Sequence, residues 1–162
     1  MKKSIPFLLL SLFFLFFVSC SKKAVYEETV YFPDNNWAFE NKAVTFTAHL
    51  TGSEKPFTVY IELELVGNLN VDMFYASFTF ILPGGGKTIK PLTFNFITPH
   101  EPYIYKKGAP ANERIFRLTL YPKKYFSETG DYTFEINQFS NKADNYGIKS
   151  MTLKIEKIKN DN

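Results

Sequence analysis

The chain has 162 residues, of which 19 are basic and 16 acidic, and aromatic residues make up 18% of it. A single cysteine excludes an internal disulfide, and a formal charge of only +3 gives no strong sequence-independent attraction to phosphate backbones. We therefore expect one domain that is stabilised by packing and binds no nucleic acid.

The first twenty residues have the pattern of a bacterial lipoprotein signal. Two lysines follow Met1, residues 5–18 form an apolar segment, and Ser19 precedes Cys20. The end of this segment resembles a lipobox, in which signal peptidase II cuts before a cysteine that carries diacylglycerol. We expect removal of residues 1–19 and lipidation of Cys20, which then anchors the chain to a membrane. The alternatives are a transmembrane helix, for which the apolar run is short, and an ordinary secretory signal.

Removal of the signal takes two lysines and no acidic residue with it, so the remaining chain is close to neutral. We expect residues 20–24 to comprise the lipidated N-terminus and a tether. The tether is short, because four fully extended residues span only about 14 Å. We expect a folded domain over residues 25–158, close to the bilayer surface, and a polar tail over residues 159–162.

Alternation of apolar and polar residues predicts β-strands in the first half of this domain. Three runs place apolar side chains at every second position: residues 44–50, 57–65 and 74–82. The cluster Pro83-Gly84-Gly85-Gly86 predicts a turn after the third run, and the return strand begins at Lys87. Pro91 favours an edge position or a bulge for that return strand.

The alternation breaks over residues 98–110, where prolines and a glycine are interspersed with Tyr103 and Tyr105, and we expect the longest loop there. Alternation resumes in three further runs: residues 115–120, 132–136 and 151–156. Pro122 is expected to stop the first of them. Seven or eight turn-separated strands without a helical period predict a single antiparallel β-sandwich, of jelly-roll or immunoglobulin-like topology.

Few residues offer catalytic chemistry. The two histidines, His49 and His100, do not lie in a metal-ligand spacing. Glu62 and Glu64 are expected roughly 7 Å apart on one strand face, a separation at which two carboxylates can flank a glycosidic bond. A solvated strand face explains this pair more simply. We therefore expect no enzymatic activity, no metal and no cofactor.

Binding through aromatic rings is an alternative function. Trp37 follows the turn-rich segment 33–36, and Tyr103 and Tyr105 lie in the long loop. Rings in such positions can stack on a sugar or contact a protein partner, while packing within the core or the loops is the other role open to each. The sequence thus leaves a glycan-binding envelope lipoprotein as the alternative hypothesis.

Two stretches of the chain resemble the GldH family of gliding-motility lipoproteins. One runs from Val25-Tyr26-Glu27-Glu28 to Pro33-Asp34-Asn35-Asn36-Trp37, and the other comprises Gly130-Asp131-Tyr132-Thr133-Phe134-Glu135-Ile136-Asn137-Gln138 and Leu153-Lys154-Ile155-Glu156-Lys157. The resemblance implies a lipid-anchored, non-enzymatic component of the gliding apparatus and its associated secretion system, with envelope proteins as partners. It assigns no catalytic residue.

The residue after the cysteine also bears on sorting. Ser21 is not the aspartate that, in known lipoproteins, retains the protein in an inner membrane. We therefore expect the outer membrane, facing the periplasm, as the location of the anchored protein.

Overall fold

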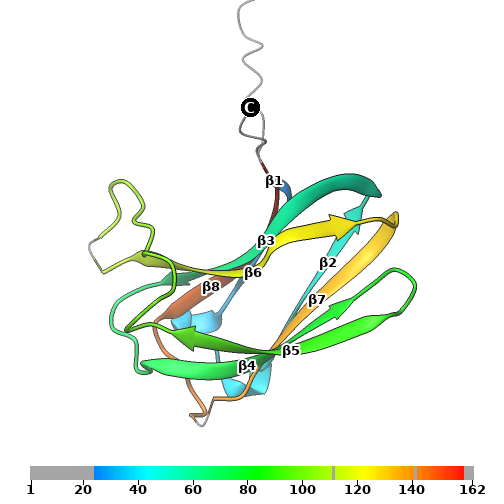
Figure 1. The fold of residues 1–162 in the computed structure, drawn as a ribbon. Helices are drawn as coiled ribbons and strands as arrows, with labels where there is room; N and C mark the ends of the chain where they lie inside the picture. The colour runs from blue at the N-terminus through cyan, green and yellow to red at the C-terminus, as the bar shows by residue number, and fades with distance from the viewer. Residues whose placement is uncertain (1–23, 111, 141, 159–162) are drawn as a thin grey trace, which may run out of the picture.

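The computed structural model describes residues 24–110, 112–140 and 142–158, which form two packed antiparallel sheets of four strands each (Figure 1). The strands, in chain order, are β1 (Ala24–Tyr31), β2 (Ala43–Leu50), β3 (Ser53–Leu65), β4 (Met73–Ile81), β5 (Lys87–Asn95), β6 (Arg114–Phe126), β7 (Gly130–Gln138) and β8 (Ile148–Lys157). Two short 3₁₀ turns, η2 (Pro33–Asn35) and η3 (Phe39–Asn41), connect β1 to β2. The predicted β-sandwich is confirmed.

The strand pairing identifies the sandwich as a jelly roll rather than an immunoglobulin-like fold. One sheet has the order β1-β8-β3-β6 and the other the order β2-β7-β4-β5. The first four strands therefore pair with the last four in reverse order, β1 with β8, β2 with β7, β3 with β6 and β4 with β5. The chain is in effect one long hairpin, turned between β4 and β5, that is rolled into two sheets.

The core lies between the sheets and is built from the apolar positions of the alternating runs. In β2, for example, buried and exposed residues alternate along the whole strand. Four phenylalanines from four strands, Phe46, Phe78, Phe94 and Phe134, are fully buried. Full burial of such a side chain contributes about 1.5–3 kcal/mol, so these aromatic residues are a large part of what stabilises the fold.

Proline has different consequences in the two edge strands β5 and β6. The edge position predicted from Pro91 is confirmed, because β5 lies at the edge of its sheet. The prediction that Pro122 stops its strand is wrong, because β6 continues to Phe126. β6 is itself an edge strand, and its register against β3 shifts between Phe57 and Val59. An edge strand with such an irregularity accommodates a residue that has no N–H to donate.

Both ends of the described chain lie at the same end of the sandwich (Figure 1). Ala24, at the start of β1, is opposite Glu156 near the end of β8. The predicted signal segment 1–19, Cys20 and the tail 159–162 lie outside the described residues. In the part of the chain that the structure describes, no helix is long and apolar enough to cross a membrane.

Candidate functional site

The outer face of the β1-β8-β3-β6 sheet carries a network of paired charges, which we call the charged face. It comprises Glu27, Glu62, Glu64, Arg117, Lys149 and Lys154 from the four strands, and Lys106 from the long loop. A further ion pair, between His49 and Asp131, lies on the opposite sheet. The charged face is therefore the first candidate for a functional site.

Glu62 is at the centre of this network and is only 7% exposed. The sheet register places it opposite Arg117 of β6, and the Arg117 guanidinium donates to its Oε1 at 3.1 Å from Nε and 2.5 Å from Nη2. Lys154 of β8 lies 3.1 Å from Glu62 Oε2 and 3.1 Å from Glu27 Oε1. The two strands that flank β3 thus each supply one counter-charge to the Glu62 carboxylate.

Glu64 has a similar environment one step along β3. Its Oε1 lies 2.9 Å from Lys106 Nζ and 3.1 Å from Lys149 Nζ. Burial alone would raise the pKa of Glu64, but the hydrogen bonds and charges of the two lysines outweigh it and hold this pKa below its usual value. A general acid needs a raised pKa, so the shift is opposite to that role. The solvated face expected for Glu62 and Glu64 is wrong, because their side chains are only 9% and 15% exposed.

We expect the Glu64→Gln variant to be less stable than the wild type by about 1 kcal/mol at neutral pH. The folded pKa of Glu64 is lower than its unfolded value of about 4.3, so its contribution is present above that value and is lost as the pH falls through the folded pKa. Urea unfolding at a series of pH values should show a difference that shrinks in acid. A difference that stays constant with pH would contradict the proposed charge pairing.

A pocket of about 190 Å³ opens on the charged face between β1, β8 and the long loop. Its wall includes the hydroxyls of Thr29 and Thr152, which lie 2.8 Å apart, and the paired carboxylates of Glu62 and Glu64. Small-molecule sites usually enclose about 300–1,000 Å³ and are mostly apolar. This pocket is smaller and its carboxylates already have cationic partners, so its features are those of a structural network.

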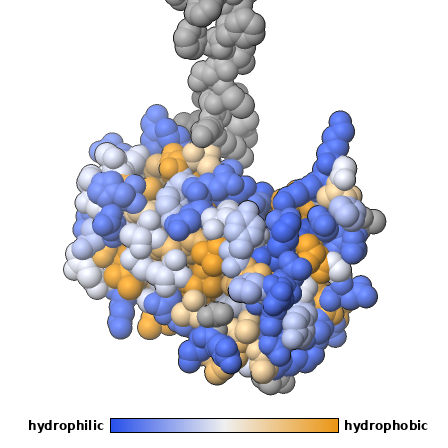
Figure 2. Space-filling model, turned by 180° about the vertical axis from the view of Figure 1, so that it is seen from behind, coloured by the Kyte–Doolittle hydropathy of each residue, from blue (hydrophilic) through white to orange (hydrophobic). Residues whose placement is uncertain are grey.

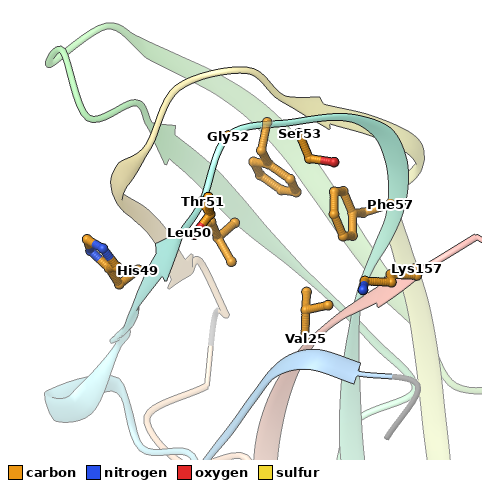
Figure 3. Close-up of a pocket in the computed structure, with 9 residues that line it drawn as sticks. Val25, His49, Leu50, Thr51, Gly52, Ser53, Phe57 and Lys157 are labelled. Carbon is orange, nitrogen blue, oxygen red and sulfur yellow. The ribbon is translucent and has the colours of Figure 1, made fainter. Parts of the chain in front are cut away.

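A second pocket, of about 350 Å³, lies at the end of the sandwich where β1 begins (Figure 3). Val25, Leu50, Phe57 and Phe126 form its apolar lining. His49 lies at its rim and points away from the opening in Figure 3, and its Nδ1 is 2.7 Å from Asp131 Oδ1. The hydroxyls of Thr51 and Ser53 also line the pocket, but among the described residues His49 is hydrogen-bonded to Asp131 and to neither hydroxyl. The lining therefore does not show an assembled pair of nucleophile and base.

The aromatic residues proposed as contacts are not brought together on one surface. Trp37 is 0% exposed, stacks on Phe32 at 5.5 Å and meets the edges of Phe74 and Phe94, so its role as a glycan or partner contact is wrong. Tyr103 is half-buried, and its hydroxyl donates to the carbonyl oxygen of Phe96. Tyr105 is 63% exposed. The described structure therefore offers one of these three rings, not a platform, to a ligand.

The burial of Trp37 has a local cause. Asp34 and Asn35 in η2 both adopt positive φ, at 52° and 53°, which reverses the chain direction just before the tryptophan. The Trp37 carbonyl oxygen then accepts hydrogen bonds from Gln138 Nε2 at 2.9 Å and from Asn145 Nδ2 at 3.0 Å. Asn145 also donates to Gln138 Oε1 at 2.8 Å. This buried polar group, which sequence reasoning missed, fixes the loop that carries Trp37 onto the β7–β8 connection.

On the outer face of the other sheet, the described residues form the His49–Asp131 ion pair and otherwise expose apolar side chains among hydroxyl and amide groups. Met73, Tyr75, Ile89 and Phe139 are each about half exposed or more. On the side of the molecule seen in Figure 2, hydrophilic side chains likewise interrupt the apolar patches. Exposed apolar residues dispersed in this way are normal for a protein surface and do not define a binding site.

Metal ligation is a further possible role for the described acidic and histidine side chains. Within residues 24–110, 112–140 and 142–158, no three His, Cys, Asp or Glu side chains are grouped so that they could hold a metal ion. His49 and His100 are both exposed. Comparisons of the chain with protein-family models, curated proteins and solved structures found no match.

Proposed function

We propose that this chain is a lipid-anchored, non-enzymatic lipoprotein of a bacterial envelope that acts by binding other envelope proteins. Its resemblance to the GldH family suggests a component of the gliding-motility apparatus and its associated secretion machinery, anchored in the outer membrane and facing the periplasm. The observation that carries the proposal is the position of Cys20, which ends a signal-like segment only a few residues before β1 begins at Ala24.

The chemistry of such an anchor supports a permanent attachment. A single acyl chain binds a bilayer only marginally, at about 0.8 kcal/mol per buried methylene, whereas diacylglycerol with a further N-acyl chain holds nearly irreversibly. The tether between Cys20 and Ala24 extends to about 14 Å at most. The domain is thereby kept at the membrane surface, where its partners are other envelope proteins.

The charged face supports a non-enzymatic role. Glu62 and Glu64, the two carboxylates placed closest to a glycosidase arrangement, are each held by two cations. The lowered pKa of Glu64 favours the ionised form that its lysine partners need. A glycan platform that includes Trp37 is incompatible with the position of this ring in the core, which leaves Tyr105 as the exposed ring.

The proposal predicts that the Cys20→Ala variant loses both lipid and membrane attachment. In the native host, wild-type protein should incorporate labelled palmitate and sediment with the outer membrane, because Cys20 is its acyl acceptor. Crosslinking and mass spectrometry of the tagged wild type should recover motility or secretion proteins, and the variant should recover none of them.

The matched control is the Ser21→Ala variant, which changes the next residue and leaves the acceptor cysteine in place. It should be labelled and recover the same partners as the wild type. Palmitate on the Cys20→Ala protein would refute the anchor. An anchored wild type that recovers no envelope protein would refute the partner role and leave the anchor intact.

A further inference from the structure

Two lysines lie at the seam between the edge strands β5 and β6, and no described acidic residue forms an ion pair with either of them. Lys90 of β5 and Lys124 of β6 are both placed over the ring of Tyr121, with their Nζ atoms 4.1 and 5.1 Å from its centroid. Lys90 Nζ also donates to the carbonyl oxygen of Leu120 at 2.6 Å, and Lys124 Nζ lies 4.6 Å from the centroid of Phe80. Two half-buried ammonium groups therefore share one aromatic surface.

This arrangement is unlike that of the charged face, where the lysines have carboxylates within 3.1 Å. Among the described residues, no carboxylate lies within ion-pair distance of Lys90 or Lys124. Burial, and secondly the charge of Lys124, lower the pKa of Lys90. An anion placed between the two ammonium groups would relieve both effects.

The sheet register places Lys124 at the end of the domain from which the chain leads to Cys20. Lys124 is opposite Phe57 of β3, and Phe57 is opposite Lys157 of β8. β1, the next strand, begins at Ala24. Because neighbouring strands lie about 4.8 Å apart, three spacings separate the backbones of Lys124 and Ala24 by roughly 14 Å.

The residues beside the lysine pair fit a membrane surface. Lys123 is exposed, and its Nζ lies 5.6 Å from the ring centroid of the half-exposed Tyr125. Tyrosine and lysine together are typical of the headgroup region, where the ring meets apolar groups and the ammonium meets phosphate. The charge of Lys90 and Lys124 and the short tether thus both favour a membrane surface as the binding partner.

We propose that Lys90 and Lys124 form a binding site for the phosphate of an anionic phospholipid, which holds this end of the domain against the membrane. The inference rests on the proposed lipid anchor, because the tether is what brings the seam within reach of headgroups. Lysine is a common phosphate ligand, since its compact charge accepts many geometries. A second, non-covalent contact would fix the orientation of a domain that the anchor alone leaves free to rotate.

Amine acetylation of the full lipidated protein in vesicles tests this site. One vesicle preparation contains phosphatidylglycerol and the other phosphatidylcholine alone, and mass spectrometry reads the acetylation of each lysine. Lys90 and Lys124 should be acetylated several-fold more slowly on phosphatidylglycerol. Lys107, exposed in the loop at the far end of β6, should react equally on both. Equal acetylation of Lys90 and Lys124 on the two vesicles would overturn the proposal.

Variants show whether the pair itself causes the protection. In the double variant Lys90→Met, Lys124→Met, phosphatidylglycerol should no longer protect Lys123 from acetylation. In the control double variant Lys107→Met, Lys142→Met, this protection of Lys123 should remain. The Lys124→Gln single variant gives the same comparison if the double variant fails to fold. Protection of Lys123 that persists without the pair would overturn the proposal.

A third arm separates the membrane from soluble anions. The wild type in neutral detergent is treated with inorganic phosphate or an acidic oligosaccharide before acetylation. Protection of Lys90 and Lys124 equal to that on phosphatidylglycerol would assign the site to a soluble anion and overturn the lipid proposal. Palmitate labelling is measured on the same preparation, so failure of the anchor and failure of the lysine site are told apart.

Discussion

Replacement of Trp37 by alanine is expected to lower the free energy of unfolding by about 3–5 kcal/mol. The indole is fully buried and contacts Phe32, Phe74 and Phe94, so its removal leaves a cavity among rings that cannot all move to fill it. Urea unfolding followed by circular dichroism measures the loss, because Trp37 is the chain's single tryptophan and its fluorescence is absent from the variant.

The control is the Tyr105→Ala variant, because Tyr105 is a loop tyrosine that the sequence also offered for binding. Tyr105 is mostly exposed, so this change should stay within about 0.5 kcal/mol of the wild type. If the two variants were destabilised equally, the burial of Trp37 described above would be incorrect. In the wild type, emission of Trp37 should shift to longer wavelength only on unfolding.

The second large effect is expected at Glu62. The Glu62→Leu variant should lose about 2–3 kcal/mol, because the change leaves Arg117 and Lys154 without their shared carboxylate. The loss is below that of a fully buried pair, since both cations retain some contact with water. The midpoint of urea denaturation at neutral pH gives the comparison.

A combined variant separates charge pairing from packing. Replacing Glu62 with leucine and both Arg117 and Lys154 with methionine removes the carboxylate and its cations together. Apolar replacements of a whole buried ionic group are often neutral, so this variant should recover most of the lost stability. If it were as unstable as Glu62→Leu, the aliphatic contacts of Glu62 would matter more than its charge.

The sequence predicted those elements whose signals are local. The run 57–65 lies within β3, and Gly84 to Gly86 form the turn between β4 and β5. β1 was not predicted as a strand, because its residues are half exposed at a sheet edge and have no clean alternation. Pro122 was assigned to a strand end because the sequence does not reveal that β6 is an edge strand with an irregular register.

Candidate site residues were harder to place because their environments come from distant parts of the chain. Turn residues before Trp37 indicated an exposed loop, but the same turn directs the ring into the core, where the β7–β8 connection holds it. Alternation correctly placed Glu62 and Glu64 outside the core. It gave no information on the lysines and arginine that β6, β8 and the long loop bring to them, since those contacts depend on strand order.

The reverse-order pairing of the strands has a consequence for when the protein folds. The hydroxyls of Thr29 and Thr152 meet across 123 positions of the chain, and β1 lies at the sheet edge with β8 as its neighbour. Contacts so distant in sequence form late and slowly, and they need the last strand to have been synthesised. For the export that we propose, this topology leaves β1 without its neighbouring strand until β8 has been synthesised. A truncation that removes β8 would also release β1, and with it the link between the N-terminal end, where we propose the anchor, and the rest of the domain.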